Sequence, residues 1–297
     1  MYKIVTKKKG GALAGILFCL FVLTTGAGAY PLRLEDQFGR PVTLERPPAR
    51  IVSGSPGNTE ILFVLGLADR VVGVTDWCDY PPAAKAKPKI GDIAPINIER
   101  VIALRPDLVL ACNLNGKEPV ESLTAFGIPT FALNPVSFAD LGEAIRLVGQ
   151  LTGTQNTAEQ LAAELETALA ALAPVGEATG APPKVLIAIG PSLADLWTAG
   201  TGTFLDEAVT YLGWENIAGG LGFSWGQISL EYILAENPEI ILTELDPEVF
   251  RTDPFFGELV AVQRGQVFQI DMDIFSRPGP RLIKALEDLA RLRERIR

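Results

Sequence analysis

One phrase occurs twice in this chain of 297 residues, and the repetition constrains the fold more than any other feature. The segment INIERVIALRPDLVLA begins at Ile96, and the segment SLEYILAENPEIILT begins at Ser229. In each segment a glutamate, Glu99 or Glu231, stands seven residues before a proline, and an aliphatic run follows. Each segment therefore predicts a short helix, a proline stop and a buried strand. A chain that repeats this unit is expected to contain two similar lobes.

Short aliphatic runs alternate with helical segments in both halves of the chain. The first half contains RIVSGS, RVVGVT, DLVLAC and IPTFAL, and the second half contains KVLIAIG, LWTAG, EIILTEL and QVFQID. Strands that alternate with helices are typical of a parallel sheet with crossover helices. The predicted fold class is therefore α/β, with two Rossmann-like lobes. A hairpin, LRLEDQFGRPVTL, is predicted to precede the first lobe and to turn at Gly39.

The segment TAEQLAAELETALAALA, residues 157–173, predicts one long helix between the lobes. It is rich in Ala, Leu and Glu and lacks Gly and Pro, and Thr157 is its expected N-cap. We therefore expect an N-terminal lobe over residues 30–150, an inter-lobe helix over 151–181 and a C-terminal lobe over 182–297. A ligand cleft is expected between the lobes, and a single connecting helix predicts only a small hinge motion.

The first residues have the pattern of a secretory signal peptide. Lysines at 3 and 7–9 form a positive region, residues 12–23 form a short apolar core, and Ala27-Gly28-Ala29 is a small-residue cleavage site. Residues 1–29 are therefore predicted to be a signal peptide, and the mature protein is expected in the periplasm. The alternative is a lipoprotein acylated at Cys19 and held at the cell surface.

The composition narrows the possible functions. The chain contains no histidine, which removes the commonest general base and every Ser-His-Asp arrangement. The segment GSPGNTE, residues 54–60, lacks the lysine of a P-loop and the spacing of a dinucleotide fingerprint. A net charge of −9 argues against nucleic-acid binding through a basic surface. We expect no catalytic residue, resident cofactor or protein-bound metal; a hydrolase with paired carboxylates is the distant alternative.

Two cysteines follow predicted strands in the expected mature chain. Cys78 and Cys112 would form a disulfide in an exported protein or remain as two buried thiols, and the sequence leaves both alternatives open.

Aromatic residues gather where predicted strands end. Trp77, Phe223, Trp225 and Phe275 lie in loops after strands or in glycine-rich segments, whereas Trp197 lies within an apolar strand and is predicted to be core. Ligands of parallel α/β sheets bind outside the carboxyl ends of the strands. The four loop aromatics therefore predict a cleft for a flat, largely apolar ligand.

The repeated glutamates have two interpretations. Asn97 and Ser229 are expected N-caps, which places Glu99 and Glu231 in the first helical turns. A carboxylate there complements the helix dipole. Alternatively, each lobe presents one exposed carboxylate to the arginines of a partner.

With these residues assembled, the chain resembles the substrate-binding proteins that serve ABC importers of cobalamin, haem and iron–siderophores. The segments that carry the resemblance are PPARIVSGSPGNTEILFVLGL, DYPPAAKAKPKIGD, NIERVIALRPDLVLA and FSRPGPRLIKALEDLA, and it covers essentially the whole mature chain. The resemblance implies a monomer of two α/β lobes joined by one helix. It also implies a permease with its ATPase as the partner, docked through Glu99 and Glu231. Asp273 and Arg277 fall in the family's cleft segment.

Within the family, the chain is most similar to the cobalamin-binding branch, whose cleft aromatics correspond to Trp77 and Trp225. That branch has a further tryptophan where this chain offers only Ile93. A corrinoid is the favoured metal chelate because it needs aromatic walls and no protein ligand. An iron–siderophore would need several cleft arginines or lysines, for which the sequence offers Arg277 and Arg281, and haem would need an axial ligand such as Tyr80.

Overall fold

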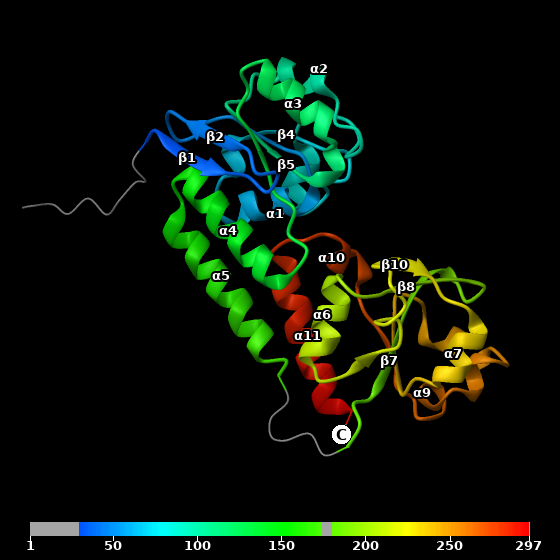
Figure 1. The fold of residues 1–297 in the computed structure, drawn as a ribbon. Helices are drawn as coiled ribbons and strands as arrows, with labels where there is room; N and C mark the ends of the chain where they lie inside the picture. The colour runs from blue at the N-terminus through cyan, green and yellow to red at the C-terminus, as the bar shows by residue number, and fades with distance from the viewer. Residues whose placement is uncertain (1–29, 174–179, 297) are drawn as a thin grey trace, which may run out of the picture.

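The computed structural model describes residues 30–173 and 180–296 as two α/β lobes flanked by long helices (Figure 1). The predicted signal peptide, with Cys19, lies outside the described residues. Among these described residues, no helix combines the length and the hydrophobicity that a membrane span requires.

The N-terminal lobe contains a four-stranded parallel sheet in the order β4-β3-β5-β6. Its strands are β3 (Ile51–Ser53), β4 (Val71–Val74), β5 (Leu108–Ala111) and β6 (Thr130–Ala132). Its helices are α1 (Pro56–Val64), α2 (Ile98–Ala103) and α3 (Lys117–Ala125). The predicted hairpin is confirmed as β1 (Leu32–Glu35) and β2 (Pro41–Leu44), and Gly39 has the positive φ of +71° that the turn requires.

The C-terminal lobe contains a mixed sheet in the order β10-β8-β7-β11-β12, with β9 paired to β7. Its strands are β7 (Lys184–Ser192), β8 (Asp195–Ala199), β9 (Glu215–Asn216), β10 (Trp225–Gln227), β11 (Ile240–Thr243) and β12 (Val267–Gln269). Its helices are α6 (Phe204–Tyr211), α7 (Leu230–Glu236), α8 (Pro247–Thr252), α9 (Val260–Gln263), α10 (Met272–Ser276) and α11 (Arg281–Arg295).

The expectation of a purely parallel sheet is wrong for the strand LWTAG. This strand is β8, and it pairs antiparallel with both β7 and β10. Only Leu193 and Ala194 separate β7 from β8. Two residues are enough for a hairpin but far too few for the crossover that a parallel neighbour needs.

The repeated phrase forms the same unit in both lobes. Helix α2 leads into β5, and α7 leads into β11. Both units also place a left-handed residue directly before the proline, Arg105 with φ +46° and Asn237 with φ +44°. The prediction of two lobes that share a helix–proline–strand unit is therefore confirmed.

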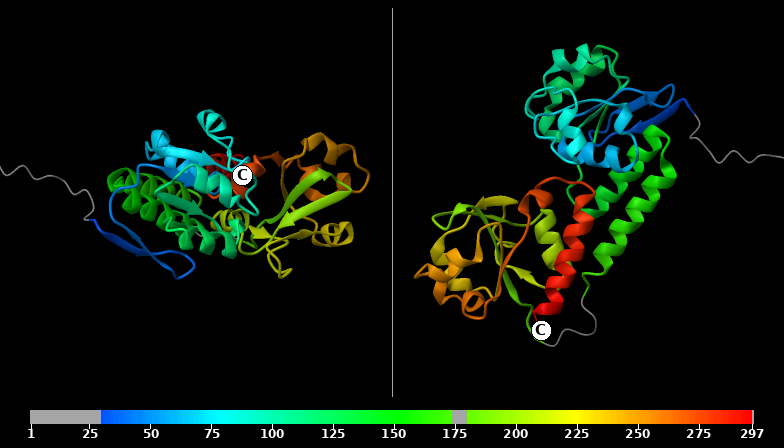
Figure 2. Two further views of the ribbon diagram at one scale, coloured as in Figure 1. Left: turned by 90° about the horizontal axis from the view of Figure 1, so that it is seen from above. Right: turned by 180° about the vertical axis from the view of Figure 1, so that it is seen from behind.

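The connection between the lobes is a pair of helices, α4 (Phe138–Thr152) and α5 (Gln155–Ala170), which run side by side (Figures 1 and 2). The predicted long helix is α5, but Thr157 lies inside it rather than at its N-cap, which is Thr154. The shift arises because Gly153, with φ +77°, ends α4 in a left-handed turn and α5 begins directly after it. Phe138 packs edge-to-face on Phe204 of α6, with ring centroids 5.0 Å apart.

One hydrophobic cluster extends through both lobes. It includes Ile51 and Leu110 from the N-terminal sheet, Leu161 from α5, Leu286 from α11 and Ile187 from β7. Because these side chains belong to one packed core, the lobes are not independent bodies on a flexible linker.

The structure shows the state of the two cysteines, which the sequence left open, and places Trp197 differently from the prediction. Cys78 and Cys112 are buried free thiols, so the disulfide alternative is not what the structure shows. Trp197, predicted to be core, is 43% exposed. Side chains alternate along a strand, and in β8 Leu196 and Thr198 take the inward positions, which turns Trp197 outward.

Candidate functional site

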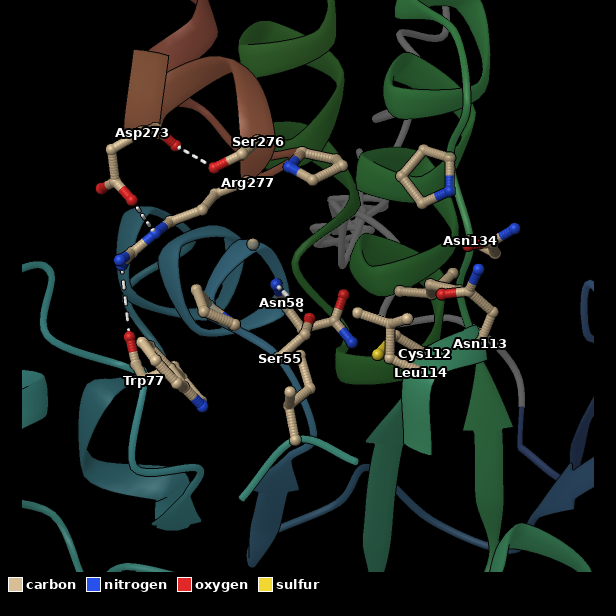
Figure 3. Close-up of a pocket in the computed structure, with 16 residues that line it drawn as sticks. Ser55, Asn58, Trp77, Cys112, Asn113, Leu114, Asn134, Asp273, Ser276 and Arg277 are labelled. Atoms are coloured by element: carbon tan, nitrogen blue, oxygen red, sulfur yellow. Dashed lines mark hydrogen bonds and ion pairs between the residues drawn. The ribbon is translucent and has the colours of Figure 1, made fainter. Parts of the chain in front are cut away.

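A cavity of about 330 Å³ lies between the lobes (Figure 3). Its N-terminal side is built at the carboxyl ends of all four parallel strands. Ser55 follows β3, Trp77 follows β4, Asn113 follows β5 and Asn134 follows β6. This edge is where ligands of parallel α/β sheets bind, because the loops there converge and the first turns of the following helices point at it.

The C-terminal lobe closes the cavity with α10 and the loop after it. Asp273, Ser276 and Arg277 line the cavity from this side. Met272 and Phe275 of the same helix face the core instead. Neighbouring positions on a helix point in different directions, so one short helix serves both the core and the cavity.

Trp77 is held from both lobes. Its indole Nε1 donates to Asp92 Oδ1 at 2.8 Å, and its carbonyl accepts from Arg277 Nη1 at 3.2 Å. The hydrogen bond from Trp77, with a second one from the Ile93 N–H, holds the pKa of Asp92 below its ordinary value. Trp77 is 55% exposed and lines the cavity, so the orientation of its indole depends on the hydrogen bond to Asp92 rather than on packing.

Arg277 is paired with two carboxylates. It donates to Asp79 of the N-terminal lobe at 2.5 Å and to Asp273 of α10 at 2.8 Å. Partial burial alone would raise the pKa of Asp79, but the hydrogen bond and charge of Arg277 outweigh it and the pKa is lowered. Among the described residues that line the cavity, Arg277 is the arginine, and its acidic partners already compensate its charge.

Behind the cavity the two lobes meet closely. A Cβ atom at Gly57 would lie 2.0 Å from the carbonyl oxygen of Pro278, so only glycine permits this approach. Arg281 forms a two-pronged ion pair with Glu60 and stacks on Tyr80, with its guanidinium carbon 4.6 Å from the ring centroid. Tyr80 borders a separate groove and does not line the cavity.

The structure brings together some of the predicted site residues and separates others. Trp77, Asp273 and Arg277 line one cavity. The expectation that Phe275 lines it needs correction, because Phe275 is 3% exposed and packs in the core. Its position after the final strand does not show that α10 turns this ring inward.

Phe223 and Trp225 lie outside the cavity, around β10. In Figures 1 and 2, β10 lies on the side of the C-terminal lobe that faces the N-terminal lobe. Trp225 is 45% exposed, and in the β8–β10 register it pairs with Ala199 while Gln227 pairs with Trp197. Directly paired residues share a sheet face, so Trp197 and Trp225 are diagonal neighbours on one exposed face.

Sequence reasoning missed the polar side chains of the cavity, Asn58, Asn113 and Asn134. The available signal was their position, since Asn113 and Asn134 come directly after predicted strands. Trp197 was missed because an apolar strand does not reveal which of its faces is covered.

The repeated glutamates occupy matching positions. Asn97 and Ser229 are confirmed as N-caps, accepting hydrogen bonds from the backbone N–H of Arg100 and Tyr232. Glu99 and Glu231 lie exposed in the first turns of α2 and α7, one in each lobe. In the part of the chain that the structure describes, no cluster of three or more acidic or cysteine side chains is arranged to hold a metal.

Comparison with known proteins identifies relatives along most of the chain. Residues 51–274 match the periplasmic binding protein family. A vitamin B12-binding protein of Salmonella paratyphi A is 33% identical over 84% of this chain and 91% of its own length. The ABC transporter substrate-binding lipoprotein YvrC of Bacillus subtilis, described as uncharacterized, is 31% identical over 96% of both chains.

Solved structures support the same fold. The periplasmic heme-binding protein RhuT from Roseiflexus, in its apo form, has a TM-score of 0.71 and 28% identity, covering 83% of this chain and 98% of its own. The vitamin B12-binding protein BtuF of Vibrio cholerae has a TM-score of 0.72 and 24% identity, covering 84% and 98%. At 24% identity, the similarity to BtuF supports the fold alone.

Proposed function

The chain belongs to the periplasmic binding protein family, as a substrate-binding protein of the ABC importers for vitamin B12, haem and iron, and we propose that its cargo is a corrinoid. The observation that carries the proposal is the cavity at the four strand ends, with an exposed tryptophan, Trp77, at its wall. Trp197 and Trp225 offer a second aromatic surface on the facing lobe. Broad apolar rings suit a large, flat macrocycle, which loses water from both faces when it binds.

The charges of the cavity favour a corrinoid over an anionic chelate. Arg277 is held by Asp79 and Asp273, so the arginine at the cavity has no charge left uncompensated. A polyanionic siderophore would meet these carboxylates without a surplus of arginines to offset them. A corrinoid brings its own metal and needs no ligand from the protein.

Haem is the second candidate, and the likeness to the heme-binding RhuT favours it. Haem iron in proteins takes an axial His, Cys, Met or Tyr. Tyr80, the tyrosine expected for that role, stacks on Arg281 outside the cavity. Cys112 lines the cavity, but its thiol is buried and burial raises its pKa, which disfavours the thiolate that a haem iron would need. Haem is therefore the less favoured cargo, since Tyr80 would have to leave its contact with Arg281 to serve instead.

Delivery to the membrane is proposed to use Glu99 and Glu231 as docking groups. Both are exposed, both lie in the first turn of a capped helix, and each lobe supplies one. An exposed carboxylate on a rigid helix suits a bidentate contact with an arginine of a permease. The periplasmic and lipoprotein relatives support an exported protein, and we propose that residues 1–29 are the export signal.

The cargo is tested by calorimetric titration of residues 30–297 with cyanocobalamin and with cobinamide. We expect saturable binding of one corrinoid per chain, unchanged on release, and weakened at least about tenfold by Trp77→Ala, since losing a stacked aromatic wall costs more than about 1.4 kcal/mol. Phe126→Ala is the matched control, because Phe126 is an exposed aromatic residue at the end of α3 in the same lobe. Binding of haem or a ferric siderophore without binding of either corrinoid would contradict the proposed cargo.

A further inference from the structure

The floor of the cavity contains one asparagine whose orientation is fixed. Asn58 of α1 is 4% exposed, and its Nδ2 donates to the carbonyl oxygens of Leu110 at 3.2 Å and Ala111 at 3.1 Å, at the end of β5. Both hydrogens of the amide nitrogen are thus directed at the sheet. In the planar amide, Oδ1 is the polar atom that remains for a ligand, and Figure 3 shows this amide between Trp77 and Leu114.

Further uncharged polar groups surround Asn58. Asn113, which is exposed, and Asn134, which is half-buried, line the same cavity from the loops after β5 and β6. Ser55 lies beside Asn58 as the N-cap of α1 and accepts from its backbone N–H at 3.2 Å. The N-terminal lobe therefore supplies amides and a hydroxyl to the cavity floor, and the charged lining residues, Asp273 and Arg277, come from the facing lobe and pair with each other.

A fixed amide oxygen discriminates between chemically similar groups. It accepts a hydrogen bond from a carboxamide N–H, but it opposes a carboxylate, which has only acceptors. If Asn58 rotated to offer its nitrogen, it would lose both hydrogen bonds, and its Oδ1 would face two carbonyl oxygens that are also acceptors, so this orientation is disfavoured. A site built to hydrogen-bond a donor rejects an analogue that lacks the donor.

We propose that this floor, formed by Asn58, Asn113 and Asn134, is a carboxamide-recognising subsite. The inference rests on the proposed function and deepens it, because the rim of a corrin ring carries carboxamide side chains whereas the rim of haem carries carboxylates. Trp77 and the β8–β10 face hold the flat ring, and the floor distinguishes an amide-bearing macrocycle from an acidic one.

The test compares two corrinoids that differ in this group. Dicyanocobinamide carries side-chain amides, and dicyanocobyrinic acid is the same ring with carboxylates in their place. We expect the acid to bind at least about tenfold more weakly at neutral pH. The double variant Asn113→Leu with Asn134→Leu should weaken the binding of cobinamide and reduce the affinity ratio between cobinamide and cobyrinic acid. Neither substitution lies in β5. Asn156→Leu, at an exposed asparagine of α5, is the matched control.

Asn58→Leu adds a direct probe of the anchor. Its thermal unfolding is followed in parallel, because leucine cannot donate to the two β5 carbonyls. A folded Asn58→Leu variant, which has no acceptor oxygen at this position, should lose affinity for cobinamide. Equal binding of both corrinoids by the native protein would overturn the subsite and leave the corrinoid cargo standing. No binding of either corrinoid would overturn the cargo and the subsite together.

Discussion

Glu60 and Arg281, 221 positions apart in the sequence, form a buried ion pair that ties the lobes together. Glu60 Oε1 accepts from Arg281 Nε at 3.0 Å and from Nη2 at 2.8 Å. Glu60 is 1% exposed, and its other oxygen, Oε2, is buried without a hydrogen-bond partner among the described residues. The pair joins α1 to α11 directly behind the cavity, where Gly57 and Pro278 also meet.

Removing one member of this pair is expected to destabilise the fold. Glu60→Ala leaves the Arg281 guanidinium half-buried without its partner, and breaking a buried pair in this way costs about 3–5 kcal/mol. Urea unfolding followed by circular dichroism measures the loss. Glu248→Ala is the control, because the pair of Glu248 with Arg251 lies at the surface and should contribute little. Equal losses in the two variants would contradict a structural role for the buried pair.

The stability of the protein should depend on pH through Glu60. Burial raises the pKa of Glu60 above its ordinary value of 4.5, and the opposing effect of Arg281 is smaller. The folded state therefore binds the proton more tightly than the unfolded chain. This contribution to stability is complete below pH 4.5 and is lost as the pH rises through the folded-state pKa.

Glu60→Gln cannot titrate, so it should remove this fall in stability. Urea unfolding free energies of the native protein and the variant, measured from about pH 4 to about pH 7, give the comparison. As the pH rises, the unfolding free energy of the native protein should fall relative to that of Glu60→Gln. A constant difference across this range would show that Glu60 titrates alike in the folded and unfolded states.

Asp92 is expected to position Trp77 for the ligand. Their hydrogen bond of 2.8 Å is the polar contact that orients an otherwise exposed ring. Asp92→Ala should weaken corrinoid binding about two- to tenfold, less than Trp77→Ala, since it removes one hydrogen bond and leaves the ring. It should also change the fluorescence of Trp77 in the unliganded protein. Asp76→Ala, at an exposed aspartate beside Trp77, should change neither the corrinoid affinity nor the fluorescence of Trp77.

The docking proposal separates transport from binding. Glu99→Arg combined with Glu231→Arg should abolish uptake in cells and leave corrinoid affinity unchanged, because both side chains are exposed on helices outside the cavity. Glu118→Arg with Glu248→Arg is the matched control, since these are also exposed first-turn glutamates, one in each lobe. Loss of ligand affinity in the first double variant would mean that Glu99 and Glu231 serve the fold instead.

Ligand binding is expected to change the overall shape very little. The lobes share a hydrophobic core and are joined by α4, α5 and the Glu60–Arg281 pair. Small-angle X-ray scattering with and without cobinamide should therefore give the same radius of gyration within error. A clear decrease on binding would instead require a hinge that opens this core.

Local sequence patterns were enough to predict most of the elements and their repetition in the two lobes. The phrase around Glu99 and Glu231 became the same helix–proline–strand unit twice, with Asn97 and Ser229 as its caps. These features depend on hydrophobic period, proline and capping chemistry, which act over a few residues and are therefore readable locally. The position of Trp77 at the cavity could also be predicted from the sequence, because ligands are expected to bind at the carboxyl ends of the strands of a parallel sheet.

Which side of each element is covered could be seen only in the packing of the folded chain. It turned Phe275 into the core and Trp197 out of it, and it placed Asn58 against the end of β5. It also paired Glu60 with Arg281 from opposite ends of the chain. Side-chain direction on a strand or helix follows from what packs against it, and those partners come from distant segments whose pairing no local pattern specifies.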